Sequence, residues 1–393
     1  MTATATAQTS KVDIWTDEVL LNPHDTYTAL REQAPVVYLE ASDVWALTRY
    51  AEIRDALGDW ESFSSTKVAF NPQMNEVLTG TTLASDPPLH TQLRATLSEN
   101  LTPRALRGLK VTIDEKADRL VADVVDRGSF DGVRDLAQEL PLQIVLDLIG
   151  VQGEVREKIL PWGNAAFNLL GPMNERAQQS FPLAGELFEW THGMQGDKLA
   201  EGSIGRAIFD AGARGDIPQE LCGHIIHQYL AAGMDTTIGS IANTIRLFGE
   251  NPEEFAKVQA DPSLIPSAFN EVLRMEAAMH AQGRGTTRDV EIGGTVIPEG
   301  AQVAVLFYAG NRDPRHYDEP DTFRVERNPL DHLTFGYGVH GCAGQGLAKL
   351  EAHAVIEAFC RRVDSFEVGE PTVKLNNTSR GLETLPVFDV VAA

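Results

Sequence analysis

Cys342 is the residue whose surroundings most directly suggest chemistry. It lies in "FGYGVHGCAG", residues 335–344, where glycine recurs around the sulfur, at Gly336, Gly338, Gly341 and Gly344. Glycine tolerates positive φ angles and close backbone approaches, so this loop can hold a sulfur against a large flat group. A helical pattern follows at once, and its free N–H groups and dipole would lower the thiol pKa. The pattern therefore predicts a thiolate that acts as an axial ligand of haem iron.

Two other interpretations of this loop are available. A lone buried cysteine is usually an ordinary core residue. Residues 336–341 also match the G-x-G-x-x-G spacing of dinucleotide-binding turns. That fingerprint needs a preceding apolar strand and a βαβ unit, whereas "VERNPLDHLT" precedes the glycines here. The glycine cradle and the following helix favour the haem ligand.

A second group with chemical potential is the acid–alcohol pair Asp235 and Thr236. It lies in "YLAAGMDTTIG", within a helical pattern that spans 218–249. Glycine in mid-helix is unfavourable, so the small residues at 231–233 indicate that a flat ligand approaches this face. A threonine there can bond to the carbonyl four residues earlier and bend the helix, which alone would explain it. A carboxylate beside a hydroxyl can also relay protons inward.

The elements that must position these groups are mostly helices. Periodicity predicts helices at 23–33, 50–57, 87–98, 104–127, 136–149, 153–169, 177–194, 218–249, 252–260, 264–277 and 344–362. Short strands are predicted at 35–39, 44–48, 289–297, 301–307 and near 366–390. The segment "EIGGTVIPEG" is typical of a hairpin, because Gly-Gly separates β-forming residues. We predict a mainly α protein with a minor β lobe, in one domain over 1–393.

Composition and charge narrow the function classes. The chain has 33 basic and 56 acidic residues, and its net charge of −23 argues against general binding to nucleic acids or acidic membranes. The segment "MTATATAQTSKV" lacks the pattern of a secretion signal, and no run of 18 apolar residues occurs. The three cysteines fit neither a zinc site nor a disulfide framework. We expect a protein of the reducing bacterial cytoplasm.

Three motifs in order along the chain carry a family resemblance. Residues 335–344 match the haem loop F-G-x-G-x-H-x-C-x-G of cytochromes P450 at every fixed position. The stretch "AAGMDTT" resembles the oxygen-activating motif of that family's central helix, and "EVLR" resembles its E-x-x-R pair. The segments "DPPLHTQLR", "NRDP" and "RGLETLP" extend the resemblance over nearly the whole chain. It implies the cytochrome P450 fold, a triangular helical prism with haem b between the central helix and the cysteine-loop helix.

The resemblance implies roles for residues in these motifs. Asp235 and Thr236 are expected to be catalytic, as the pair that supplies protons during oxygen activation. Arginine and histidine are expected to bind the haem propionates, because guanidinium groups suit carboxylates. The expected haem contacts, with Cys342 as the metal ligand, are His90, Arg94, Ala232, Arg284, Phe335, Gly336, His340, Cys342 and Gly344.

Glu271 and Arg274 of "EVLR" are expected to be structural. They are three residues apart on one predicted helix and therefore share a face. An exposed helix pair is the plain alternative. The resemblance implies instead a buried charge network with Arg324 or Arg327, which would brace the loop behind the cysteine.

The substrate is indicated more weakly. The segments "VVYLE", "FNLLGPMNE" and "NNTSRGLETLP" resemble bacterial P450s that demethylate methoxy-substituted aromatic acids and lignin-derived phenols. Benzoate-demethylating members carry arginine and serine before "DPP", whereas "NEVLTGTTLASDPP" has no arginine. They also carry a bulky aromatic where this chain has Gly283, which we interpret as enlarging the pocket. The expected substrate contacts are Phe70, Phe167, Leu170, Gln228, Ala231, Ala232 and Gly283.

These departures predict oxidative O-demethylation of an uncharged methoxyphenol, such as guaiacol or syringol, with release of formaldehyde. The alternatives are demethylation of methoxybenzoates, hydroxylation of a terpene or polyketide metabolite, and a haem-binding sensor or carrier. Dioxygen is the implied co-substrate. Electrons are expected from a ferredoxin or flavodoxin-like protein with an NAD(P)H reductase. The cations expected at its docking face near the cysteine are Arg104, Arg107, Lys110, Lys349, Arg361 and Arg362.

Overall fold

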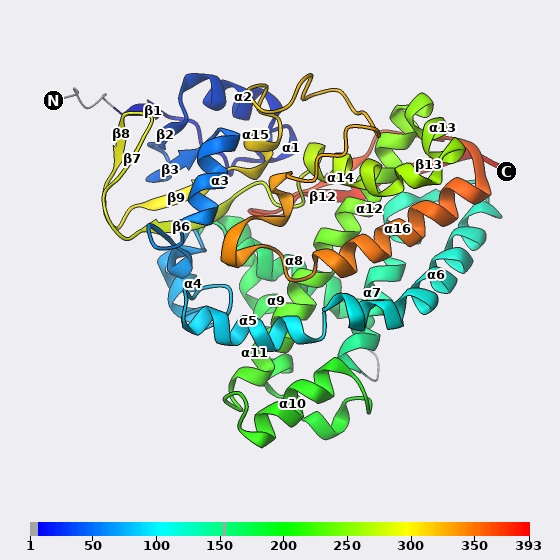
Figure 1. Cartoon of the computed structure of the whole chain (residues 1–393), viewed down its shortest axis with the longest axis horizontal. Helices are drawn as coiled ribbons and strands as arrows, with labels where there is room; N and C mark the ends of the chain where they lie inside the picture. Colours follow the sequence, from blue (N-terminus) through cyan, green and yellow to red (C-terminus); the bar gives the residue numbers. More distant parts are fainter. Residues whose placement is uncertain (1–6, 152–154) are drawn as a thin grey trace.

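The computed structural model describes residues 7–151 and 155–393, most of them in helices (Figure 1). The helices are α1 Asp17–Leu21, α2 His24–Gln33, α3 Tyr50–Gly58, α4 Pro72–Val77, α5 Leu89–Glu99, α6 Pro103–Val125, α7 Glu139–Ile149, α8 Arg156–Leu169, α9 Glu175–His192, α10 Ile204–Arg214, α11 Leu221–Gly233, α12 Asp235–Glu250, α13 Pro252–Ala260, α14 Ile265–Met275, α15 Phe307–Asn311 and α16 Gln345–Arg362. The predicted helix over 153–169 begins at residues outside the described ranges. The mainly α prediction is confirmed. Within the described residues, no helix combines the length and apolar character that a membrane span requires.

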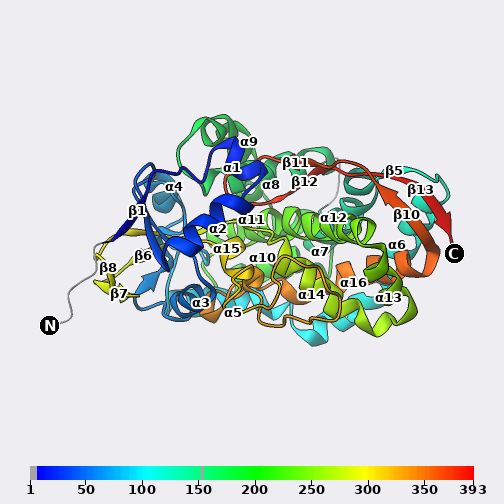
Figure 2. The same cartoon turned by 90° about the horizontal axis from the view of Figure 1, so that it is seen from above.

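The described strands form small sheets. They are β1 Gln8–Ser10, β2 Val36–Leu39, β3 Val44–Leu47, β4 Phe63–Ser64, β5 Phe130–Asp131, β6 Gln282–Thr286, β7 Val290–Ile292, β8 Thr295–Ile297, β9 Gln302–Val305, β10 Val363–Val368, β11 Thr372–Lys374, β12 Gly381–Thr384 and β13 Pro386–Ala392. The largest sheet has the order β1-β2-β3-β9-β6-β4, and it lies at the opposite end of the molecule from β10, β13 and β5 (Figure 2).

The sequence predicted one feature of the sheets, the β7–β8 hairpin, but did not predict another, the strand β6. β7 and β8 form the predicted hairpin, and both Gly293 and Gly294 between them have positive φ. β6 was not predicted, because its sequence "QGRGT" contains two glycines and few β-forming residues. It nevertheless pairs with β9 and β4, so it is a strand by its tertiary partners.

The central helix differs from its prediction because it is broken at Met234. α11 ends before this residue and α12 begins after it, while Met234 has φ −107° and ψ −72°. The Thr236 hydroxyl donates to the Ala232 carbonyl oxygen at 2.9 Å, so a side chain competes with the helical backbone ladder here. The threonine bond to the carbonyl four residues earlier is therefore confirmed, whereas the helical pattern predicted over 218–249 forms two helices instead of one. The break separates the small residues from the acid–alcohol pair.

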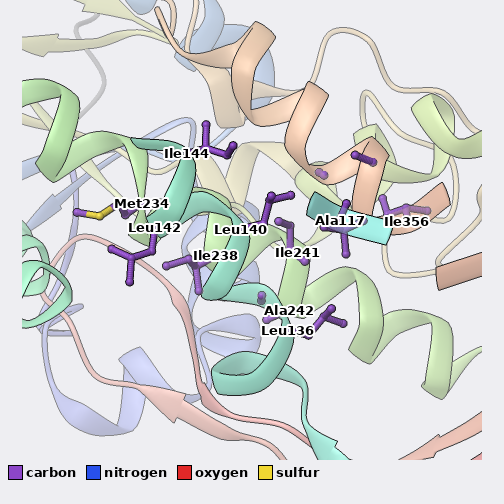
Figure 3. Packing of buried hydrophobic residues seen from close by; sticks show 14 of the residues in the cluster. Ala117, Leu136, Leu140, Leu142, Ile144, Met234, Ile238, Ile241, Ala242 and Ile356 are labelled. Atoms are coloured by element: carbon purple, nitrogen blue, oxygen red, sulfur yellow. The ribbon is translucent and has the colours of Figure 1, made fainter. Parts of the chain in front are cut away.

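Two hydrophobic cores hold these elements together. The larger joins the long helices, and Figure 3 shows residues such as Leu140 of α7 and Ile241 of α12 within it. The smaller lies between the largest sheet and α2, α3 and α15, with Tyr27, Leu39 and Ile53 buried in it. α16, which follows the cysteine loop, packs against α6, α12 and α14. The cysteine loop is therefore carried by the most heavily packed helices.

A buried carboxylate, Glu276, follows α14 and joins three distant arginines. Its oxygens lie 3.0 Å from Arg246 Nη2, 3.4 Å from Arg312 Nη2 and 3.5 Å from Arg380 Nε. Burial raises the pKa of Glu276, but the three guanidinium groups outweigh it and hold the pKa below its ordinary value. The network ties α12 to the segment after α15 and to the segment before β12.

We expect Glu276→Gln to lower the free energy of unfolding at pH 7 by about 3 kcal/mol, because buried guanidinium groups lose their anion. The pKa of Glu276 in the folded protein lies below the ordinary 4.5. Its stabilisation is therefore complete above pH 4.5 and is lost as the pH falls through the folded-state pKa. Urea unfolding of both proteins should show a difference that narrows below pH 4.5.

Glu250→Gln is the matched control, because Glu250 is a half-exposed partner of the same Arg246. Its loss should stay within about 0.5 kcal/mol. Equal losses in the two variants, or a pH-independent difference for Glu276→Gln, would contradict the assigned role of the buried carboxylate.

Candidate active site

The cysteine loop is shaped by backbone hydrogen bonds that fold the chain back on itself. The Cys342 N–H donates to the Phe335 carbonyl oxygen at 2.7 Å, and the Gly341 N–H donates to that of Gly338 at 3.0 Å. Gly338 has φ +70°, and a Cβ there would lie 2.5 Å from the Leu57 carbonyl oxygen. The loop therefore requires glycine where it passes the end of α3.

The other glycines of the loop differ in what they contribute. Gly336 has φ +66°, a region that favours glycine. Gly341 has φ −50°, a value that any residue can adopt. Gly344 caps α16, and a Cβ on it would lie 3.9 Å from the Cys342 sulfur. That is an ordinary van der Waals distance, so the sulfur itself does not require glycine at this position.

Burial raises the pKa of the Cys342 thiol above its ordinary value. The backbone N–H groups of Gly344 and Gln345, and the Arg94 guanidinium, act in the opposite direction but do not outweigh burial. The predicted net lowering is therefore wrong for the free thiol. The same N–H groups would stabilise the thiolate once a metal ion has replaced the proton.

A buried ion network supports the loop from behind. Arg274 donates two hydrogen bonds of 2.7 and 2.9 Å to Glu271 on α14, and both side chains are fully buried. Arg327 Nε lies 2.9 Å from the same carboxylate. The Arg324 side chain instead pairs with exposed acidic residues, and only its backbone N–H reaches Glu271. Of the two candidates, Arg327 supplies the third charge.

This network reaches the cysteine loop in short steps. Arg274 Nη1 donates to the carbonyl oxygens of Asn311 and Pro320, at 3.0 and 2.7 Å. The Asn311 side chain accepts from the Leu333 N–H at 2.7 Å and donates to Thr334 Oγ1 at 2.9 Å. Leu333 and Thr334 lead directly into the loop. The Glu271 network thus fixes the position at which the loop begins.

Four basic side chains gather beside the loop. His90 and Arg94 lie one turn apart on α5, Arg284 is buried on β6, and His340 lies in the loop itself. The ring centroids of His90 and His340 are 4.1 Å apart, and Arg94 donates to the Gly341 carbonyl oxygen. Both ring nitrogens of His90 and Nε2 of His340 are buried with no hydrogen-bond partner in the described part of the chain.

The electrostatics of this cluster indicate a missing anion. Burial lowers the pKa of all four groups, and their mutual repulsion lowers the pKa of His90 and His340 further, to about 3 for His340. The Asp86 carboxylate acts in the opposite direction and raises the pKa of His90 and Arg284, but it does not outweigh burial. Arginine and histidine pair well with carboxylates in such sites. The two propionates of haem b therefore fit the cluster, with the Cys342 sulfur as the donor to iron.

The acid–alcohol pair lies just after the helix break, and its two members have different partners. The Thr236 hydroxyl reaches back to α11, where Ala232 is exposed. The Asp235 carboxylate is buried, and its Oδ2 lies 3.1 Å from Lys374 Nζ on β11. Burial raises the pKa of Asp235, and Lys374 opposes that rise. The sequence did not indicate Lys374, since it lies 139 positions away and belongs to no motif.

Segments predicted to line the substrate pocket meet in the structure. The Phe70 N–H donates to the Leu170 carbonyl oxygen at 2.8 Å, which joins the segment after β4 to the end of α8. The Phe167 carbonyl oxygen accepts a hydrogen bond of 2.8 Å from Thr378 Oγ1 in the loop before β12. Three segments far apart in sequence are therefore held together by hydrogen bonds.

Gly283 has another role than the one predicted. Its N–H donates to the Val68 carbonyl oxygen at 3.0 Å. A Cβ on Gly283 would lie 2.5 Å from the carbonyl oxygens of both Lys67 and Val68. The glycine allows β6 to pass close to this backbone, so the interpretation that it enlarges the pocket is wrong.

Gln228 offers a free polar group on α11. It lies one helical turn before the small residues Ala231 and Ala232 and is half-buried. Its side chain makes no hydrogen bond within residues 7–151 and 155–393. A neutral amide in this position can donate and accept hydrogen bonds with a ligand.

Comparisons with known proteins agree on one family. The family profile "Cytochrome P450" matches residues 220–382. Cytochrome P450 CYP199A2 of Rhodopseudomonas palustris is 36% identical over 383 residues, which cover 96% of this chain and 93% of that protein. The 6-deoxyerythronolide B hydroxylase of Saccharopolyspora erythraea is 30% identical, covering 96% and 99%. The structure of cytochrome P450 CREJ with (4-ethylphenyl) dihydrogen phosphate superposes with TM-score 0.86 at 29% identity, covering 94% and 97%.

The Glu271 network generates a test with an internal control. We expect Arg327→Met to lower the free energy of unfolding by about 2 kcal/mol, because a buried carboxylate loses one of its two cations. Arg324→Met removes a neighbouring but exposed guanidinium and should cost less than about 1 kcal/mol. Urea unfolding and the fraction of haem retained after gel filtration measure the two effects. A larger loss of unfolding free energy in Arg324→Met than in Arg327→Met would contradict the assignment of Arg327 as the second cation bound to Glu271.

Proposed function

The chain belongs to the cytochrome P450 family, and on that premise we propose that it demethylates small uncharged methoxyphenols of the guaiacol or syringol type. As a member it is a monooxygenase that binds haem b through a cysteine thiolate and takes electrons from redox partners. We infer that Cys342 is that ligand. One observation carries the choice of substrate: the segment 68–88 contains no lysine or arginine.

The proposed reaction balances as a monooxygenation. The methoxyarene, dioxygen, NAD(P)H and a proton give the phenol, formaldehyde, water and NAD(P)⁺. Haem, when bound, supplies the activation of dioxygen by two electrons. Hydroxylation of the methyl carbon gives a hemiacetal, which breaks its C–O bond to release formaldehyde and the phenol.

The protein contributes orientation, an apolar wall and protons. We propose that Phe70 and Phe167 supply aromatic surface to the pocket; the Phe70 ring packs against Trp15, and Phe167 is buried. Such surfaces clamp a benzene ring, while a few polar groups fix its orientation. We propose that the half-buried Gln228 amide binds the phenolic hydroxyl. Asp235 and Thr236 would hold and move protons beside the small residues of α11.

The lack of a cation disfavours a carboxylate substrate. Lys67 immediately precedes the segment 68–88, but its Nζ is bound to the Gly300 carbonyl oxygen. A buried carboxylate without a partner is costly, so a methoxybenzoate would bind poorly. A neutral phenol needs only hydrogen bonds. The phenyl ligand solved in the related cytochrome P450 CREJ supports an aromatic substrate class for this chain.

We propose a ferredoxin or flavodoxin-like electron donor that docks over α6 and α16. Arg104 and Arg107 are exposed on α6. Lys110 of α6 and both Arg361 and Arg362 of α16 are paired with acidic residues of α6, and Lys349 is half-buried. Arg104 and Arg107 form no ion pair within the described residues, so their charges are the ones best suited to attract an acidic redox protein.

A second function has some support. One relative is a hydroxylase by name, and hydroxylation of a secondary metabolite would use the same haem and the same proton supply. The closely hydrogen-bonded segments around Phe70 and Leu170 favour a small ligand over a macrocycle. We therefore place O-demethylation first.

A binding and product panel tests the substrate. We expect guaiacol and syringol to shift the haem Soret band towards high spin with a Kd at least ten-fold below that of 4-methoxybenzoate, about 1.4 kcal/mol. Formaldehyde and the demethylated phenol should form in equal amounts. Tighter binding of 4-methoxybenzoate, or hydroxylated products without formaldehyde, would overturn the proposal.

The role of Gln228 can be tested by removing either partner of its hydrogen bond. We expect Gln228→Leu to weaken guaiacol binding about ten-fold, because one hydrogen bond to a phenolic hydroxyl is lost. Methoxybenzene lacks that hydroxyl, so its Kd should change less than about two-fold in the same variant. The same loss for both ligands would show that Gln228 shapes the pocket and does not recognise the hydroxyl.

A further inference from the structure

A small cavity lies between α12 and the β11–β12 hairpin, next to Asp235. Its volume is about 30 Å³, and its polar lining consists of Gln138, Asp235, Lys374, Ser379, Arg380 and Glu383. A polar space of this size holds one or two water molecules. The cavity therefore gives water a place in contact with a buried carboxylate.

The Asp235 carboxylate is held at the inner end of this cavity. Lys374 Nζ lies 3.1 Å from its Oδ2, and the exposed fractions of the two side chains are 26% and 7%. The nearby Asn164 amide of α8 also acts to lower the pKa of Asp235 against the effect of burial. Thr236 has a different partner, because its hydroxyl is bound to the carbonyl of Ala232. The acid is thus oriented towards the cavity and the alcohol towards α11.

Glu383 connects the same cavity to the surface. Its side chain is 51% exposed and lies 3.8 Å from the exposed guanidinium of Arg134. Arg380 is otherwise engaged, because it pairs with Glu276 and donates to the Leu20 carbonyl oxygen. Exposure of the lining side chains therefore falls from the Glu383 carboxylate at the surface, through the partly exposed Lys374 ammonium, to the buried Asp235 carboxylate.

We propose that this cavity is the entrance through which solvent protons reach Asp235, with Lys374 as the positioning residue that holds the acid at its inner end. A proton bound by the Glu383 carboxylate passes through cavity water to an oxygen of Asp235, and solvent then returns a proton to Glu383. Lys374 keeps its own protons, and its charge favours the ionised form of Asp235, which can accept a proton, against the effect of burial. The inference rests on the proposed function only in that monooxygenation consumes protons.

The first test needs no substrate. Infrared difference spectra of the haem-loaded protein follow the carboxylic C=O band of Asp235 against pH, and Asp235→Asn identifies the band by its loss. We expect Lys374→Gln to raise the titration midpoint of this band by at least about one pH unit, because the nearby cation is removed. Lys374→Arg keeps the charge and should titrate close to the wild type.

The second test measures proton delivery during turnover with guaiacol. We expect Lys374→Gln to reduce product formed per NADH consumed about three-fold or more and to raise the solvent isotope effect on turnover, because proton transfer becomes limiting. The Kd for guaiacol, read from the Soret shift, should stay unchanged. Lys158→Gln, at an exposed lysine of α8, is the matched control.

The outcomes separate this inference from the substrate proposal. An unchanged titration midpoint in Lys374→Gln overturns the inference, whatever the substrate. An equal loss of coupling in Lys374→Arg and Lys374→Gln also overturns it, because a held charge would then be irrelevant. If guaiacol gives no product but the midpoint shifts as expected, the substrate proposal fails and the position of Asp235 stands.

Discussion

The fully buried carboxylate of Glu271 is the constraint on which the cysteine loop depends. It binds two guanidinium groups, and Arg274 in turn holds the Asn311 backbone next to the start of the loop. A loop rich in glycine has a large conformational entropy, so its own hydrogen bonds cannot fix the sulfur in one place. The rigid charge network supplies that reference point. The loop can then hold the Cys342 sulfur in a fixed position for a flat ligand, and within the loop only Gly336 and Gly338 have positive φ.

Two kinds of buried charge distinguish the scaffold from the site. Around Glu271 and Glu276, every buried arginine named above has a carboxylate within hydrogen-bonding range. Around His90 and His340 the donors are buried together, yet ring nitrogens lack partners among the described residues. Burial of polar groups without partners is unfavourable and persists only where a ligand supplies what is missing. The contrast therefore supports, without reference to any motif, the proposal that haem carboxylates bind beside His90 and His340.

Sequence reasoning succeeded where information is local and failed where it is not. The glycine loop, the hairpin at 290–297 and the helical segments follow from neighbouring residues, and all appear in the structure. The Thr236 bond to the Ala232 carbonyl also follows from local sequence, but the division into two helices at Met234 was not predicted, because the helical periodicity continues through that residue. The ion pair of Asp235 with Lys374 and the backbone contact at Gly283 depend on tertiary approach, which no periodicity encodes. The thiol pKa was misjudged because burial outweighs helix N–H groups.

The disposition of cations also bears on what can bind. Of the arginines that are buried in the described structure, Arg274 and Arg312 serve internal carboxylates, and Arg31 donates to a backbone carbonyl. Arg284 belongs to the cluster that suits haem propionates, and Lys374 holds Asp235. A carboxylate entering the pocket would therefore have to take a cation from a structure that already uses it, or remain unpaired at several kcal/mol. A neutral ring with a hydroxyl meets neither cost, and this argument for a phenol is independent of any resemblance to other enzymes.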